Sequence, residues 1–268
     1  WLKVYTRALD HTCCADVISP GIDIAGRGAS MSDESGSEDD EETGTFLDND
    51  GLTSRHTPTE KAETSKYLKI YLLAAPLIGQ LLAWPTYFLS RFIPGQAGLY
   101  QQKFVFISTY QLGYAFLAVG LLRLTRGFMV ALANGARAPT GVDRPDQHVY
   151  RIKPSDSNPL WDEPFVLMAS DGAAGRFNRA QRAVFNTDET LPLFVAETLL
   201  AGSVFGPITL AMLLLVICGR CRFSCLYRDS AEARGAGFVP ALVGEQWMSG
   251  LLWVCAIQGI FYPWISRQ

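Results

Sequence analysis

Three long stretches of this chain carry almost no charge. Phe104–Leu122 has no charged residue in 19, Thr190–Cys218 has only Glu197 in 29, and Gly235–Ser266 has only Glu245 in 32. About 20 mostly apolar residues suffice for a helix to cross the hydrocarbon core of a bilayer. These stretches also lack the two-residue alternation of membrane β-strands. The sequence therefore predicts an all-α integral membrane protein and excludes a soluble enzyme.

The charged residues are distributed unevenly along the chain. Before Tyr67 there are 6 basic and 14 acidic residues, whereas the remainder holds 17 basic and 12 acidic residues. A segment this acidic and polar cannot bury enough apolar surface to offset the entropy of ordering it. We therefore expect residues 1–66 to form an acidic, disordered tail. The mature chain either starts upstream of Trp1, or Met31 begins it and residues 1–30 are a leader or targeting piece.

Residues 67–93 are apolar enough for an additional hydrophobic helix ahead of the main domain. Pro76 and Pro85 should kink this helix, because proline lacks the backbone N–H that an α-helix uses. The segment either crosses the membrane, which we expect, or lies in its interface as a re-entrant or interfacial helix.

The remainder of the chain, residues 104–264, is expected to form a bundle of four membrane helices. A polar connection rich in Pro, Asp and Gly separates the first two helices at 134–178, and Gly206-Pro207 breaks the longest apolar stretch into the second and third. The expected helices cover 104–133, about 176–200, about 207–227 and 236–264.

The basic residues predict how these helices are oriented. Nine Lys or Arg lie in 123–182 and four arginines in 219–235, whereas the turn at 202–207 has none. Basic connections favour the cytoplasmic side of a membrane, or its organellar equivalent. With five crossing helices the acidic tail falls on that same side, and with four it falls on the opposite side.

A group of polar residues is spaced for one face of the second helix of the bundle. Arg182, Asn186 and Glu189 follow one another at intervals of four and three residues, which places them on one face over two turns. Guanidinium groups bind carboxylates and Glu189 can bind an ammonium group, so this face suits a small, mostly anionic ligand. In the alternative interpretation, the arginines anchor a helix end and Glu189 simply pairs with Arg182 or Arg220.

The third helix repeats this spacing with Arg220, Phe223 and Tyr227, and Arg234 follows after a short loop. The order RAVFNTDETLP (182–192), GRCRFSCLY (219–227) and AEARGAGF (231–238) resembles the MAPEG family, the membrane-associated proteins in eicosanoid and glutathione metabolism. That family includes microsomal glutathione transferases, leukotriene synthase and prostaglandin E synthase. APTGVDRPD (138–146) resembles the loop after the first helix of the family. The resemblance covers about 104–262.

The resemblance implies a fold, a co-substrate and a set of site residues. It implies a four-helix MAPEG-type bundle, here preceded by the additional N-terminal hydrophobic helix, and a homotrimer that binds glutathione between its subunits. The implied glutathione contacts are Arg182, Asn186, Glu189, Arg220 and Tyr227, with Arg234 as the catalytic cation. A cation beside the thiol lowers the pKa of the thiol and stabilises the nucleophilic thiolate.

The implied function is that of a glutathione-dependent transferase or peroxidase for lipophilic electrophiles or lipid hydroperoxides. Its place would be a membrane of the endoplasmic reticulum or of a mitochondrion or plastid. The chain departs from the family pattern at Val184, Thr190 and Phe223, where the transferases usually carry His or Gln, Tyr, and Tyr. Ala131 and Leu132 replace basic residues that normally end the first helix. The alternative function is therefore a non-catalytic subunit with this fold in a larger membrane protein complex.

The remaining reactive residues give no site of their own. Cys218, Cys221 and Cys225 have the spacing C-x-x-C-x-x-x-C, but no histidine lies near them to complete a tetrahedral zinc site. Free cysteines are common in apolar packing. We expect neither a bound metal nor a nucleic-acid partner.

Overall fold

The computed structural model describes residues 59–142, 146–153 and 164–265, and it is almost entirely helical. Most of the expected acidic tail, residues 1–58, therefore lies outside the described residues, as does the centre of the polar connection, 154–163.

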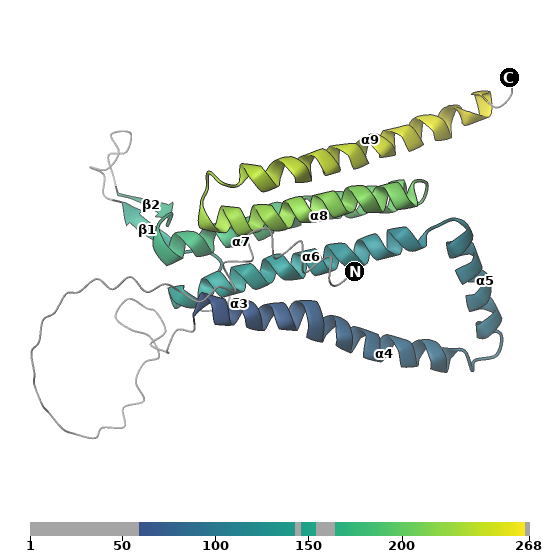
Figure 1. The fold of residues 1–268 in the computed structure, drawn as a ribbon, viewed down its shortest axis with the longest axis horizontal. Coiled ribbons are helices and arrows are strands. Elements are labelled where there is room, and N and C mark those ends of the chain that lie inside the picture. Colours follow the sequence, from purple (N-terminus) through teal and green to yellow (C-terminus); the bar gives the residue numbers. More distant parts are fainter. Residues whose placement is uncertain (1–58, 143–145, 154–163, 266–268) are drawn as a thin grey trace, which may run out of the picture.

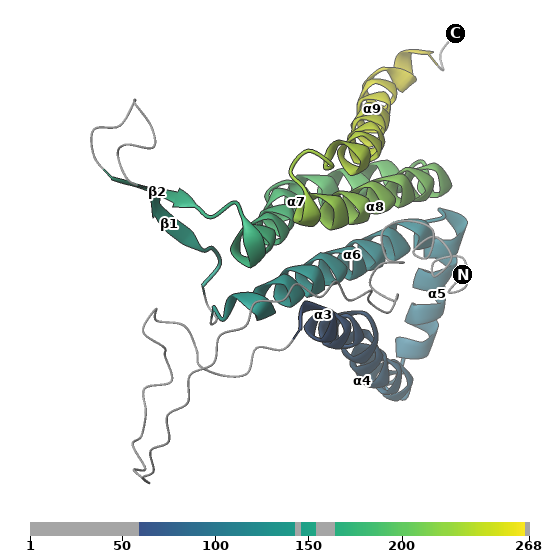
Figure 2. The same cartoon turned by 60° about the vertical axis from the view of Figure 1, so that its left-hand side comes forward.

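Four long helices make up the main part of the structure: three run side by side, and the last packs on its neighbour but is inclined to the others (Figures 1 and 2). The break at Gly206-Pro207 is confirmed, because one helix ends at Gly202 and the next begins at Gly206 with the proline in its first turn, where no N–H is needed. The helices are α6 (Gly113–Arg137), α7 (Gly172–Gly202), α8 (Gly206–Asp229) and α9 (Gly235–Ile265).

Two buried clusters hold these helices together. One includes Phe128, Leu132 and Phe177, which join α6 to α7 near the end of α6. The other includes Leu213 and Met248, which are fully buried between α8 and α9 in the middle of the bundle. In water, burial of each side chain of this size would stabilise the fold by roughly 1.5–3 kcal/mol. Within a bilayer, helices are held together by close packing instead.

The N-terminal part is one long helix, whose first half packs on α6 and whose second half, α4, diverges from it (Figure 1). It consists of α3 (Glu60–Leu68), the π-helical η1 (Lys69–Ala74) and α4 (Ala75–Ser90). The extra helix thus starts at Glu60, seven residues before its expected start. The π-helix directly precedes Pro76; a wider turn there accommodates the ring and the missing N–H of the proline.

The prediction of a single helix over 104–133 is wrong, because the structure has two helices in this region. α5 (Gln96–Thr109) crosses the end of the bundle opposite the start of α3, and α6 begins only at Gly113. Gln111 lies between them with φ of 55°, in the left-handed region that ends a right-handed helix.

The polar connection predicted at 134–178 is shorter than expected, and its described part contains two strands. Its first residues continue α6 to Arg137, a short 3₁₀ turn follows in η2 (Ala138–Thr140), and α7 already begins at Gly172. Between them, β1 (Tyr150–Lys153) pairs antiparallel with β2 (Phe165–Met168), so that Tyr150 faces Met168 and Ile152 faces Val166.

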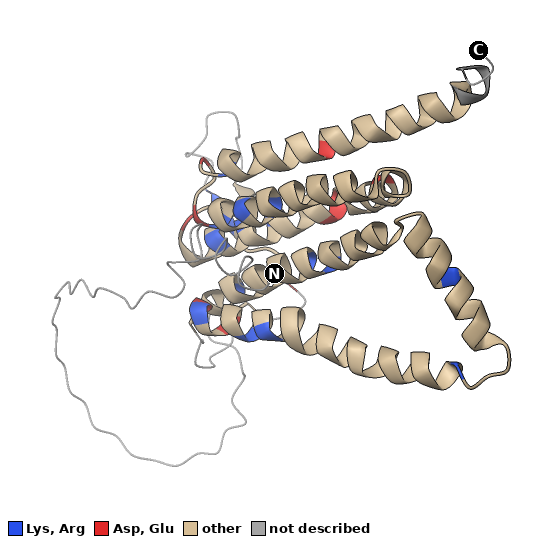
Figure 3. Cartoon of the chain, turned by 45° about the vertical axis from the view of Figure 1, so that its right-hand side comes forward, with Lys and Arg blue, Asp and Glu red and all other residues tan. Residues whose placement is uncertain are grey.

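Three helices of the described residues are long and apolar enough to cross a membrane: Glu60–Ser90, Gly113–Thr140 and Gly206–Asp229. Most charged residues gather at one end of the molecule, where α3, α7 and α9 begin and α6 and α8 end (Figure 3). We call this the charged end. The two basic connections therefore share one end of the bundle, as expected, and the start of α3 lies there with them.

Candidate functional site

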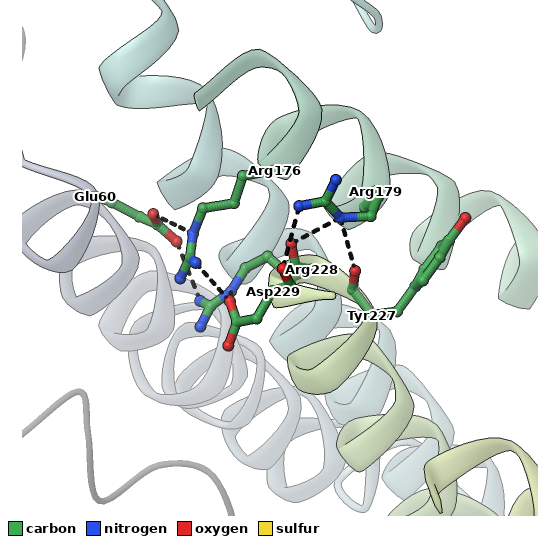
Figure 4. A network of polar contacts seen from close by, with 6 residues as sticks. All are labelled: Glu60, Arg176, Arg179, Tyr227, Arg228 and Asp229. Atoms are coloured by element: carbon green, nitrogen blue, oxygen red, sulfur yellow. Dashed lines mark hydrogen bonds and ion pairs between the residues drawn. The ribbon is translucent and has the colours of Figure 1, made fainter. Parts of the chain in front are cut away.

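The start of α7 is fixed at the charged end by an ionic network that the sequence did not predict (Figure 4). Glu60 of α3 pairs with Arg176 of α7 (Nε–Oε2, 2.7 Å) and with Arg228 of α8 (Nη1–Oε1, 3.2 Å). Arg176 and Arg228 both also pair with Asp229. Because the Arg228 side chain is only 7% exposed, its charge needs these partners, and the network ties α3 to α7 and α8.

Arg179, one turn further along α7, caps the C-terminus of α8. Its Nε donates to the backbone oxygens of Tyr227 and Arg228, both at 3.1 Å, and its Nη2 donates to that of Asp229 at 3.3 Å. The last carbonyls of a helix have no partner within the helix and carry its negative dipole end, so a guanidinium is stabilising there. This contact sets the position of α7 relative to the Tyr227 end of α8.

The next turns of α7 carry the face on which the sequence predicts a ligand site. Arg182 and Glu189 lie on this face with side chains 48% and 60% exposed, and Arg182 Nη1 is 3.5 Å from Glu189 Oε1. The pairing within one helix that the alternative interpretation proposed is therefore present. Since the contact is long and solvated, it contributes at most about 1 kcal/mol, and a ligand can displace it. Asn186 lies half-buried between them.

Arg220, unlike Arg182, is largely buried and paired with an acidic residue of another helix. Its side chain is 14% exposed, and its Nε donates to Glu245 Oε1 of α9 at 2.9 Å. Its Nη2 also donates to the Thr190 hydroxyl at 3.4 Å. Thr190 directly follows Glu189 in α7. Glu245 is thus a partner of one expected site residue, although nothing in its own sequence surroundings indicates that role.

Tyr227 and Arg234 form the third part of the expected site. The Tyr227 ring stacks on that of Phe223 with centroids 5.3 Å apart, and Arg234 Cζ lies 5.8 Å from the centroid of the Tyr227 ring. That separation is within the range of cation–π attraction. Phe223 is itself buried.

A polar cavity of about 440 Å³ lies on the adjoining face of α7, between α7, α6 and the N-terminal helix. Arg126 of α6 binds Asp188 of α7 across it through two hydrogen bonds of 2.8 and 2.9 Å. Arg137 is also in the lining, so the described lining residues include two guanidinium groups and one carboxylate. The other lining residues include Tyr71, Asn134, Gln147, Gln181, Val184 and Phe185.

His148 lies beside this face, in the segment before β1. Its ring centroid is 5.5 Å from that of Phe185, and its pKa is lowered from 6.5 by burial and by the positive charge of Arg182. The folded protein therefore binds this proton less readily than the unfolded chain does.

That pKa shift predicts a pH dependence of stability. A lowered pKa in the folded state means that stability is retained above pH 6.5 and decreases as the pH falls below it. We expect His148→Gln to reduce the fall in melting temperature between about pH 7.5 and about pH 5.5, measured by thermal unfolding in detergent. An unchanged pH profile in the variant would show that His148 does not carry the effect.

Comparison with known proteins identifies the family of this chain. The family model of the MAPEG family matches residues 112–257, more than half of the chain. The matched range begins one residue before α6 and ends within α9, so it covers the four long helices and omits α3, α4 and α5. Neither the curated proteins nor the solved structures that were searched contain a match.

Proposed function

Because the chain belongs to the MAPEG family, we propose that this integral membrane protein uses glutathione as its co-substrate. The proposed activity is that of a transferase or peroxidase acting on lipophilic electrophiles or lipid hydroperoxides. We further propose that α6–α9 are the four-helix bundle of the family, that α3–α5 are an addition to it, and that the protein acts as a homotrimer.

The exposed pair of Arg182 and Glu189 is the observation that carries this proposal. Glutathione has two carboxylates and one ammonium group, so it needs at least one cation and one anion in the same site. Arg182 and Glu189 supply both from one helix face, and their mutual contact at 3.5 Å is weak enough to be exchanged for ligand contacts. The cavity of about 440 Å³ beside them offers room for a further part of the ligand.

The thiol chemistry is assigned to the α8–α9 junction. Arg234 is exposed and directly precedes α9, and the Tyr227 ring holds it through the cation–π contact. A guanidinium in this position stabilises a thiolate over a thiol and so raises the concentration of the nucleophile at neutral pH. The thiolate then attacks the electrophile, and Tyr227 can hydrogen-bond to the sulfur or to the developing negative charge.

Glutathione binding to the detergent-solubilised wild type should be weakened at least about tenfold by Arg182→Ala, because a charged hydrogen bond to a carboxylate is lost. Isothermal titration calorimetry measures the effect. Arg151→Ala is the matched control, since Arg151 is also an exposed arginine with an acidic partner, Asp171, but lies on the hairpin. A folded wild type that binds no glutathione would contradict the proposed function.

One observation favours the alternative function, a non-catalytic subunit of a larger complex. One face of the hairpin presents only apolar side chains, and they are 42–74% exposed: Tyr150, Ile152, Val166 and Met168. An exposed apolar face of this kind is typical of a surface that contacts another protein. Purification of the chain as a homotrimer without other subunits would argue against this alternative.

A further inference from the structure

The elbow between α4 and α5 encloses a second cavity, of about 480 Å³, outside the part of the chain that matches the family model. The turn that forms it ends at Gly95, whose φ of 82° is readily available only to glycine. The small residues Ala97 and Gly98 leave space beside it. Its larger lining residues are Tyr87, Arg91, Tyr100, Gln101, Phe104 and Ser108.

Aromatic rings form much of the wall of this elbow cavity. The Tyr87 ring centroid is 5.8 Å from that of Tyr100 and 6.0 Å from that of Phe104, and the two ring pairs differ in their interplanar angles, 36° and 74°. The three rings therefore line the cavity at different tilts to one another. Grouped ring faces are the usual recognition site for a quaternary ammonium ion.

Arg91 brings a positive charge to the same cavity. Its Cζ lies 5.8 Å from the centroid of the Tyr87 ring, within the range of cation–π attraction. Arg91 makes no ion pair with any residue that the structure describes. The sequence itself has no acidic residue between Glu63 and Asp143.

This charge lies far from the acidic residues that the structure describes. In Figure 3, the two basic positions on the α4–α5 turn and on α5 are separate from the charged end, where the red residues gather. The guanidinium of Arg91 is therefore available to an anion other than the acidic residues that the structure describes. The nearest source is the phosphate layer of the bilayer.

We propose that the elbow cavity binds the headgroup of a choline phospholipid of the surrounding membrane. Arg91 donates hydrogen bonds to the phosphate, and the rings of Tyr87, Tyr100 and Phe104 surround the quaternary ammonium group. The acyl chains lie along α4, none of whose residues is buried and whose Leu82 and Leu89 are both 68% exposed. The exposed apolar helix beside the cavity is the reason to assign a bilayer lipid rather than free phosphocholine.

Native mass spectrometry of the full chain in detergent, titrated with phosphatidylcholine or phosphatidylglycerol, tests this site. Arg91→Gln should weaken binding of both lipids at least about tenfold, because both contain the phosphate. Tyr100→Leu should weaken phosphatidylcholine severalfold and leave phosphatidylglycerol unchanged, because only the former has the ammonium group. Lys103→Gln is the matched control, since Lys103 is a cation of α5 that does not line the cavity.

Three outcomes would overturn the proposal. The first is equal affinity of the wild type for the two lipids, and the second is equal phosphatidylcholine affinity in Arg91→Gln and Lys103→Gln. The third is displacement of phosphatidylcholine by an equal concentration of free phosphocholine, which would show that the bilayer lipid is not the specific occupant. Thermal unfolding of each variant shows whether it is folded. None of these measurements involves glutathione, so they stand independently of the proposed function.

Discussion

Replacement of Gly237 by alanine is expected to destabilise the protein by about 3 kcal/mol or more, at the upper end of the range for overpacking a tightly packed site. An added Cβ at Gly237 would overlap the backbone nitrogen of Phe223 and lie 2.5 Å from the Phe223 Cα and 2.8 Å from the backbone carbon of Arg222. All three are backbone atoms, so no side-chain rotation can relieve the overlap. The start of α9 must then move away from α8.

This movement would also disturb the proposed thiolate site. Phe223 stacks on Tyr227, and Tyr227 contacts Arg234, which precedes α9 by one residue. We therefore expect Gly237→Ala to lower both the melting temperature in detergent and any glutathione-dependent activity.

Gly250→Ala is the matched control, because Gly250 also lies within α9 but an added Cβ there has no atom within 4 Å. Alanine is favoured over glycine in a helix by up to about 1 kcal/mol, so this variant should unfold at the same temperature as the wild type or slightly higher. Equal melting temperatures for the two variants would show that α8 and α9 do not approach at Gly237 as closely as the structure places them.

The positions of the long helices could be predicted from the sequence because hydropathy and the Gly-Pro break are local signals. α7, α8 and α9 begin and end within about four residues of their expected bounds. The division between α5 and α6 was not predictable in this way. The residues around Gln111 are apolar or uncharged like their neighbours, and only the backbone geometry reveals the turn.

Within the candidate site, the shared helix face and the Arg182–Glu189 pair were predictable, but the contacts between helices were not. The spacing of Arg182, Asn186 and Glu189 placed them on one helix face because a helix has a fixed period. Arg126 and Asp188, by contrast, are 62 residues apart in sequence, and their contact depends on how α6 and α7 are set against each other along their axes. Sequence spacing within one helix carries no information about that register.

The ionic network at the charged end was missed for a related reason. Glu60 belongs to a strongly acidic N-terminal region, so composition assigned it to the tail, whereas it begins a helix and binds Arg228. A single carboxylate near two arginines of other helices is stabilised by its partners rather than by its sequence neighbours. The composition of a whole segment therefore cannot show that one of its acidic residues is held by other helices.

Asn178 gives the second large expected effect, although no sequence motif marks it. It is 2% exposed on α7, and its amide holds the base of the hairpin through three hydrogen bonds of 2.8 Å. Nδ2 donates to the backbone oxygens of Val149 and Ala169, and Oδ1 accepts from the backbone N–H of Val149. A two-stranded hairpin is marginally stable by itself, so these bonds orient it on the bundle.

We expect Asn178→Ala to destabilise the protein by about 2–4 kcal/mol, because it leaves buried backbone groups without partners and opens a small cavity. The hairpin should also detach, so trypsin should cleave after Arg151 faster than in the wild type. Asn186→Ala is the matched control, since Asn186 lies on the same helix and makes no side-chain hydrogen bond with the described residues. Unchanged cleavage after Arg151 in Asn178→Ala would mean that the hairpin is held by other contacts.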